Sequence, residues 1–124
     1  MSMGLNLTGT WKYREDFSYG DCEGVLELTH TDDNLNGTLV HTEKPLEGDS
    51  YKIRQILDGT VNFELMTFKL LAKSFSVLKT QEEIDYELDS FEAQLINDDL
   101  IVGTTEDKQG LMGVFSFKRI LENK

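Results

Sequence analysis

The sequence predicts an all-β protein, built as a single antiparallel up-and-down barrel of about eight strands. Apolar and polar residues alternate with period two along most of the chain, which is typical of half-buried strands. Asn, Asp and Gly residues separate these segments at regular spacing, as in a series of hairpins. Gly9-Thr10-Trp11 opens the first predicted strand and Arg119 lies in the last, so an arginine stacked on the indole would close the barrel.

Four strands are expected in the first half of the chain. The first begins at Gly9, and the second and third, 25–30 and 35–43, flank Asp32-Asp33-Asn34. This tripeptide predicts a turn, because Asp and Asn side chains bond their own backbone and tolerate left-handed dihedral angles. The fourth strand, 51–57, follows a loop that contains the only proline.

The remaining strands are predicted from a second set of turn residues. Asp58-Gly59 predicts a tight hairpin, because glycine accepts the positive φ of a type I′ turn, and a fifth strand at 61–65 follows. Residues 84–97 are interpreted as a strand, with a helix as the competing interpretation, because Asn97-Asp98-Asp99 leads directly into another well-alternating segment. The closing strand is expected at 111–121.

Residues 67–82 do not fit this series and are interpreted as an inserted segment. The stretch is longer than a connection between neighbouring strands requires. Its apolar residues have helical spacing, which favours a short helix over an extra strand. The surrounding 65–81 stretch has three lysines and no acidic residue, so the segment is also expected to be a mobile basic lid over the barrel mouth.

The composition predicts one domain, 1–124, with a strongly acidic surface. Asp and Glu number 23 against 12 Lys and Arg, a net charge of −11, which argues against binding to nucleic acid or to an anionic membrane. Cys22 is the only cysteine, so no internal disulfide is expected. With no signal-peptide pattern in this chain and no apolar run of membrane-spanning length, a cytoplasmic location is expected, unless a leader has been removed.

Residues near the two ends of the chain carry a family resemblance. Gly9-Thr10-Trp11 and Arg119 resemble the first-strand and last-strand motifs of the calycin superfamily, which comprises lipocalins, fatty-acid-binding proteins and avidins. Leu7-Thr8-Gly9-Thr10-Trp11 and Asn34-Leu35-Asn36-Gly37-Thr38 resemble the first and third strands of avidin and streptavidin. The resemblance implies a structural latch formed by Gly9, Trp11 and Arg119. Biotin binding is not expected, because biotin-binding members use several tryptophans and this chain has one.

Two functions follow from these features. The favoured one is a non-enzymatic lipocalin-like barrel that binds a small apolar or amphipathic molecule, with the lysines of the inserted segment favouring an anionic or amphipathic ligand. The alternative is an acidic protein-interaction module, of the inhibitor or immunity type, with a filled interior and a basic partner. The residues expected to line the interior are Tyr13, Leu26, Leu28, Leu39, His41, Tyr51, Ile53, Phe63, Tyr86 and Phe115.

No metal ligand, catalytic residue or cofactor is predicted. His30 and His41 should lie more than ~10 Å apart along one hairpin, too far to share a zinc ion. Cys22 has no basic neighbour in sequence that would activate its thiol. The chain also lacks a nucleophile elbow and a phosphate-binding glycine loop.

Overall fold

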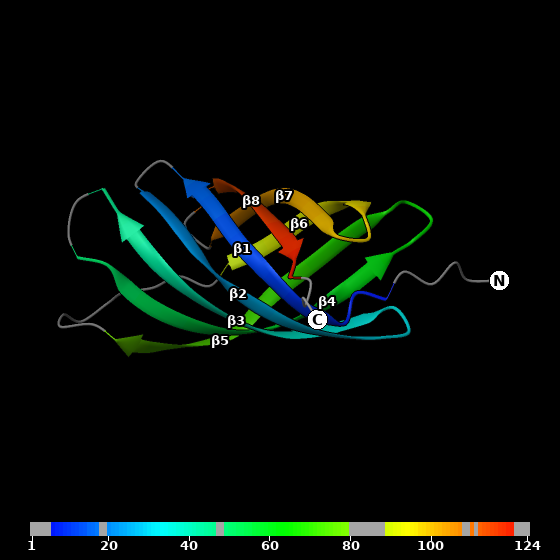
Figure 1. Cartoon of the computed structure of the whole chain (residues 1–124), viewed down its shortest axis with the longest axis horizontal. Helices are drawn as coiled ribbons and strands as arrows, with labels where there is room; N and C mark the ends of the chain where they lie inside the picture. The colour runs from blue at the N-terminus through cyan, green and yellow to red at the C-terminus, as the bar shows by residue number, and fades with distance from the viewer. Residues whose placement is uncertain are drawn as a thin grey trace.

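The protein, seen in a computed structural model that describes residues 6–17, 20–46, 49–79, 89–107, 110 and 112–120, is a closed β-barrel. The strands are β1 (Gly9–Phe17), β2 (Gly20–Thr31), β3 (Asn34–Pro45), β4 (Tyr51–Asn62), β5 (Thr67–Lys79), β6 (Asp89–Asn97), β7 (Leu100–Asp107) and β8 (Met112–Arg119). Each strand pairs antiparallel with the next, and β8 pairs with β1 (Figure 1). The predicted all-β, eight-stranded up-and-down barrel is confirmed.

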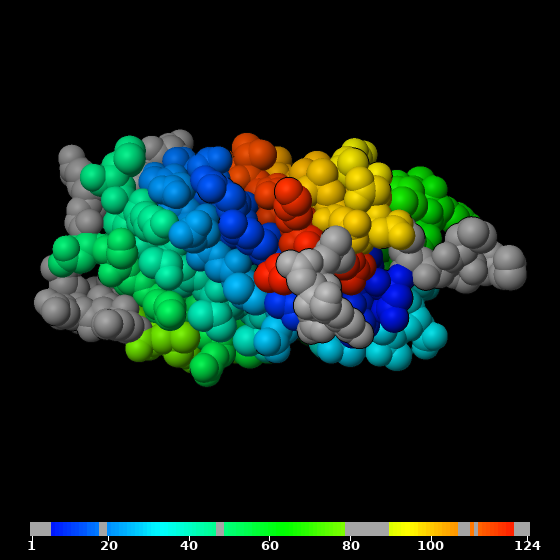
Figure 2. All heavy atoms as spheres, viewed as in Figure 1, coloured from blue at the N-terminus to red at the C-terminus, as the bar shows by residue number. Residues whose placement is uncertain are grey.

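The two ends of the barrel differ. One end, called here the Trp11 end, carries the turns at 32–33, 63–66 and 98–99. The other, the Phe17 end, is where β1 ends and β2 begins. The strands β2 to β5 have 12 or 13 residues, against eight or nine in the other four, and they extend furthest at the Phe17 end (Figure 1). The space-filling view shows β1, β2 and β3 forming a continuous outer wall on one side (Figure 2).

Alternate residues of every strand point inward and fill the Trp11 half of the barrel. Trp11, Leu26, Leu39 and Phe117 are completely buried there. The phenyl rings of Phe68 and Phe117 meet edge to face, with centroids 5.9 Å apart, a favoured arrangement for aromatic pairs. Burial of each such side chain contributes roughly 1.5–3 kcal/mol to the free energy of unfolding. This half of the interior is therefore a packed apolar core that stabilises the barrel.

The two ends of the chain meet around the indole of Trp11. The Arg119 guanidinium carbon lies 4.4 Å from the Trp11 ring centroid, and the indole Nε1 donates a hydrogen bond to the Leu7 carbonyl at 3.0 Å. Gly9 lies beside the same guanidinium, since a β-carbon there would be 3.0 Å from its Nη1. Arg119 also donates to three backbone carbonyls, those of Asn6 (2.9 Å), Thr8 (3.1 Å) and Asp98 (3.1 Å).

The interpretation of residues 67–82 as a helical insertion is wrong for Thr67–Lys79, which form β5, a full member of the barrel. Phe68 is buried, whereas Leu71 is 42% exposed. Lys73 is an extra residue in the pairing, because Ile56 pairs with Ser74 while Leu57 pairs with Ala72. This bulge changes the inward phase of the strand, and so the apolar residues acquire helix-like spacing. Residues 80–82 lie outside the described residues.

The hairpin predicted at Asp58-Gly59 is also wrong, and so is the fifth strand predicted at 61–65, because 61–62 end β4 and 63–66 form a turn. Asp58 and Gly59 both lie within β4, and Gly59 pairs with Leu35 on one side and Leu70 on the other. A β-carbon at Gly59 would come within 2.9 Å of the Leu70 Cα, so the glycine permits close approach of β5. The turn lies four residues later, where the Asn62 side chain accepts hydrogen bonds from the backbone N–H groups of Glu64 and Leu65.

The remaining predicted strands are found with shifted limits. Asp89–Asn97 forms β6, which supports the strand over the helix, whereas residues 84–88 lie outside the described residues. The turn at 98–99 is present, and the Asn97 side chain accepts a hydrogen bond from the Asp99 N–H at 2.8 Å. Within the described ranges, no helix is long and apolar enough to cross a membrane.

Candidate functional site: a buried polar cluster

Seven polar or ionisable side chains lie together inside the Phe17 half of the barrel. They come from β1, β2, β3, β4 and β7, and each is at most 8% exposed. Charged groups are rarely buried to this extent without partners, so their convergence marks the site that needs a functional explanation. This polar cluster consists of Tyr13, Glu15, Cys22, His41, Glu43, Gln55 and Thr105.

The strand register brings these residues together in two rows. Glu15 pairs with Cys22, which pairs with Glu43, so one inward row crosses β1, β2 and β3. The next row toward the Trp11 end runs from Tyr13 through Gly24 to His41. Because side chains repeat with period two along a strand, both rows face the interior.

Two glycines leave the space that these side chains occupy. Gly24 lies between Tyr13 and His41, and a β-carbon there would stand 2.6 Å from the His41 Cα. At Gly113, a β-carbon would lie 3.0 Å from the Thr105 hydroxyl and would collide with the Glu15 carboxylate. Both positions therefore require a residue without a side chain for the polar cluster to fit.

The first branch of the cluster is centred on the Glu15 carboxylate. The Tyr13 hydroxyl donates to one carboxylate oxygen, and the Thr105 hydroxyl donates to the other at 2.7 Å. The Cys22 thiol lies 3.5 Å from the Tyr13 oxygen and donates to it. The Glu15 carboxylate is therefore hydrogen-bonded to side chains of β1 and β7, two strands that are not neighbours in the barrel.

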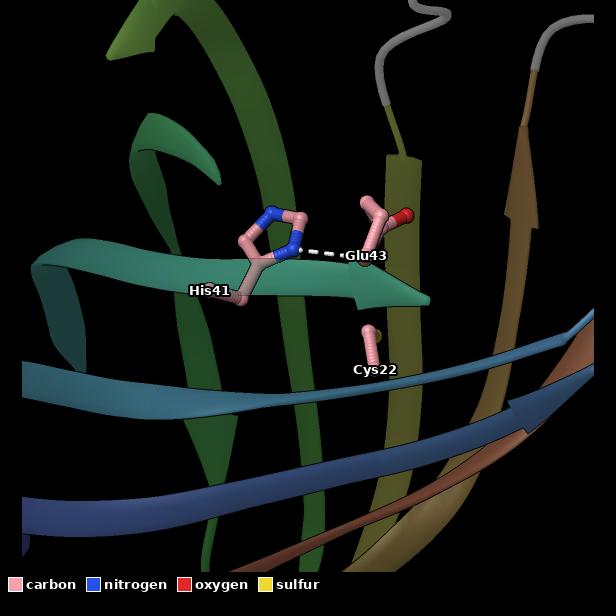
Figure 3. A group of neighbouring side chains, drawn as sticks. All are labelled: Cys22, His41 and Glu43. Atoms are coloured by element: carbon pink, nitrogen blue, oxygen red, sulfur yellow. Dashed lines mark hydrogen bonds and ion pairs between the residues drawn. The ribbon is translucent and has the colours of Figure 1, made fainter. Parts of the chain in front are cut away.

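The second branch is centred on His41. Its Nδ1 lies 2.8 Å from Glu43 Oε2 (Figure 3). Its Nε2 lies 2.8 Å from the Gln55 side-chain amide. An ionised carboxylate only accepts hydrogen bonds, so in this arrangement Nδ1 carries a proton. The imidazole is therefore held from both sides, by β3 and β4.

Burial keeps the two weakest acids of the cluster neutral. It raises the pKa of the Tyr13 hydroxyl well above its usual value, and the neighbouring Cys22 and Glu15 raise it further. Burial also raises the pKa of the Cys22 thiol, and the carboxylates of Glu43 and Glu15 add to this effect. Both groups are hydrogen-bond donors at neutral pH, so Cys22 is not an activated nucleophile in this state.

Aromatic rings surround Tyr13. Its ring centroid lies 5.5 Å from that of Phe117, 6.1 Å from that of Phe91 and 5.7 Å from the His41 imidazole. Phe91 and Phe115 meet edge to face at 5.2 Å. The cluster thus lies against an aromatic layer, which is the usual make-up of a small-molecule site: an apolar wall with a few oriented polar groups.

The structure separates the predicted interior residues into three groups. Tyr13, His41, Ile53 and Phe115 are buried in the Phe17 half. Leu26, Leu28 and Leu39 are buried in the packed Trp11 half, and Tyr51 is partly buried. Phe63, also partly buried, lies in the 63–66 turn with its ring 5.5 Å from that of His30. Tyr86 lies outside the described residues.

Sequence reasoning missed Glu15, Cys22, Glu43, Gln55 and Thr105. A signal for three of them exists, since Glu15, Glu43 and Gln55 share the inward phase of Tyr13, His41 and Ile53. Polarity argued against placing them inside. The residue that faces Cys22, Glu43, lies 21 positions away in sequence, so the sequence alone does not show this pair.

Lys69 and Lys73 of β5 lie on the outer wall of the barrel. Lys69 pairs with Glu92 at 3.6 Å and Lys73 with Asp58 at 3.8 Å, and both lysines are more than half exposed. The first pair borders an open outer groove of about 710 Å³ over β4 to β7. These two lysines therefore do not line the barrel interior, and the side chain of Lys79, the third lysine of the predicted lid, lies outside the described residues.

Comparison with solved structures shows the same class of fold. The chain is similar to a de novo designed fluorescence-activating β-barrel, with a TM-score of 0.53 and 14% identity over 91% of this chain and 93% of that one. It is also similar to two redesigned β-barrels bound to DFHBI. For mFAP1 the TM-score is 0.60 with 12% identity, over 91% of this chain and 94% of that chain. For mFAP0 the TM-score is 0.60 with 12% identity, over 94% and 100%.

These similarities show the fold alone: a closed, eight-stranded antiparallel barrel. No family model matches the sequence, and no curated protein matches it either.

Proposed function

We propose that this chain is a small-molecule-binding barrel of the calycin type, with its ligand held in the Phe17 half by the polar cluster. The observation that carries the proposal is the burial of Glu15 and Glu43 among aromatic rings. Burying charge is costly, and a barrel that needed only a stable core would be better served by apolar residues at these positions. A ligand that meets these carboxylates would explain why they are there.

The entrance is inferred from the pairing of β5. Among the described residues, β5 pairs with β6 only over Thr67–Leu71, while β4 continues alongside β5 to Lys79. Phe75 pairs with Gln55 and so has the inward phase, yet it is 37% exposed. In the described part of the chain, β5 thus has no paired neighbour on its β6 side beyond Leu71, and we place the entrance there, at the Phe17 end.

The chemistry of the lining favours a cationic or donor-rich amphipathic ligand. Glu15 and Glu43 supply acceptors, and the net charge of −11 attracts cations to the molecule. The rings of Phe91 and Phe115 offer surface for a flat apolar body. Two barrels of the same fold, mFAP0 and mFAP1, are bound to DFHBI, which supports use of this architecture for a small molecule.

The proposal is tested with two environment-sensitive dyes of opposite charge, in the presence of a chelator. The cationic dye thioflavin T should brighten on titration, and the anionic dye anilinonaphthalene sulfonate should not. Glu43→Gln and Glu15→Gln should weaken thioflavin T binding at least about tenfold, the size expected for losing one charge-assisted hydrogen bond. Glu106→Gln, at an exposed position of β7, is the matched control.

The alternative function, an acidic protein-interaction module, is supported by the filled Trp11 half and by the net charge.

Thioflavin T that fails to brighten, or that binds Glu43→Gln and Glu15→Gln as tightly as the unaltered chain, would contradict the small-molecule proposal. Native mass spectrometry of freshly purified protein adds an independent readout, since a co-purifying small molecule would support it.

A further inference from the structure

Three members of the polar cluster are arranged as metal ligands. The Cys22 sulfur, a ring nitrogen of His41 and a carboxylate oxygen of Glu43 all lie within 4.8 Å of one another, and all three residues are buried (Figure 3). Cys22 faces Glu43 directly across the β2–β3 pair, and His41 lies two residues before Glu43 on the same face of β3. Two adjacent strands therefore supply the whole set.

The distances are close to those of a tetrahedral site. Zinc–ligand bonds of about 2.0–2.3 Å place the donor atoms of such a site roughly 3.3–3.8 Å apart. The widest pair here would need to close by no more than about 1.5 Å, which side-chain torsions can supply. The pair formed by His41 Nδ1 and Glu43 Oε2, at 2.8 Å, would open slightly.

Gln55 is placed to orient the imidazole. Histidines that bind metals usually donate their other ring N–H to an oxygen acceptor. The Gln55 amide lies 2.8 Å from His41 Nε2, and rotation of that amide presents its oxygen to this nitrogen. The Nε2 proton is then held by Gln55, and the Nδ1 lone pair points toward Cys22 and Glu43.

The donor set selects one class of cation. A thiolate, an imidazole and a carboxylate suit borderline ions such as Zn²⁺ and Co²⁺, whereas Mg²⁺ and Ca²⁺ require oxygen ligands. Binding would release the thiol proton to solvent, and the thiolate and the Glu43 carboxylate would then balance the two positive charges.

We propose that Cys22, His41 and Glu43 bind one divalent cation of the zinc class, with Gln55 as a positioning residue. Three protein ligands leave a fourth tetrahedral position for water or for an atom of a bound molecule. The site does not depend on the small-molecule function proposed above, although it lies in the same half of the barrel.

Cobalt titration of the full chain, without any organic ligand, tests the site. Cys22 is the only cysteine, so a sulfur-to-cobalt charge-transfer band in the near ultraviolet reports on this residue alone. We expect the band to saturate at one equivalent of Co²⁺, and we expect Zn²⁺ but not Mg²⁺ to abolish it. Glu43→Gln and His41→Gln should each weaken Co²⁺ binding at least about tenfold, and Cys22→Ser should remove the band.

His30→Gln is the matched control, because it removes the only other histidine, which lies at the Trp11 end beside Leu7. It should leave the band and the affinity unchanged. Circular dichroism shows whether each variant keeps its β-structure. If His41→Gln does not fold, Glu43→Gln still tests the site, because glutamine has nearly the same shape as glutamate. No band at stoichiometric Co²⁺, or a band equally strong in folded Glu43→Gln, would overturn the proposal. Because the dye titration is run with chelator and the cobalt titration without dye, the two proposals can fail separately.

Discussion

Cys22 faces Glu43 across the β2–β3 pair, with both side chains inside the barrel and at most 7% exposed. Burial and the two neighbouring carboxylates raise the pKa of the Cys22 thiol, so the folded chain keeps this proton at alkaline pH. In the unfolded chain the thiol titrates near its ordinary value of about 8.5. The folded state therefore binds more protons than the unfolded state above that pH.

The first prediction concerns alkaline stability. Since stability falls with pH wherever the folded state holds the extra proton, Cys22 should lower the free energy of unfolding by about 1.4 kcal/mol per pH unit above about pH 8.5. Tyr13, whose pKa is also raised, adds to the loss only above about pH 10. Denaturant unfolding with chelator present measures the effect, and Cys22→Ser should flatten the pH dependence between these two values. Parallel curves for the two proteins would contradict the assignment.

The second prediction concerns Trp11. Its indole is completely buried beneath the Arg119 guanidinium at the point where β1 and β8 close the barrel. Trp11→Ala should lower the free energy of unfolding by ~3–5 kcal/mol, as other large core truncations do. Urea melts measure it, with Val114→Ala, at a 65% exposed position of β8, as the control. A loss below ~1 kcal/mol, far under the usual cost of such a truncation, would mean that Trp11 does not close the barrel.

The alternation of the strands made the fold class predictable, and it also placed Tyr13 and His41 inside. The errors arose where one local pattern fits two structures. Asp58-Gly59 has the sequence of a hairpin turn. In the structure, Gly59 instead allows the backbone of β5 to pack closely against β4, a contact that the local sequence does not show. In β5, the extra residue Lys73 breaks the period of two, so a strand acquires helical spacing.

The polar cluster was only partly predictable for a different reason. Glu15 and Glu43 have the inward phase, but burial of a carboxylate depends on partners in distant parts of the chain. The Thr105 hydroxyl that holds Glu15 lies 90 residues away, and the Gln55 amide that holds His41 lies 14 residues away. Such partners become visible only once the barrel register is known.

The third prediction concerns the space left by Gly113. A methyl group at this position would collide with the Glu15 carboxylate and crowd the Thr105 hydroxyl. Gly113→Ala should therefore lower the free energy of unfolding by about 1–3 kcal/mol, the usual cost of overpacking. It should also weaken thioflavin T binding, because Glu15 must move. A Gly113→Ala chain that unfolds at the same urea concentration as the unaltered chain would count against this packing.

The fourth prediction concerns β5, for which the sequence predicts a mobile lid. Thr67–Leu71 pair with β4 on one side and β6 on the other, and Phe68 and Leu70 are at most 2% exposed. Their backbone amides should exchange as slowly as those of β4, because they open only when the barrel unfolds. Among the described residues, Ser74–Val77 pair with β4 alone, so their amides should exchange faster through local opening. Hydrogen exchange followed by mass spectrometry resolves the two halves, with Leu100–Asp107 of β7, which lies between β6 and β8, as the protected reference. Fast exchange throughout Thr67–Lys79 would restore the lid interpretation, and uniformly slow exchange would show that the wall between β5 and β6 is closed at the Phe17 end.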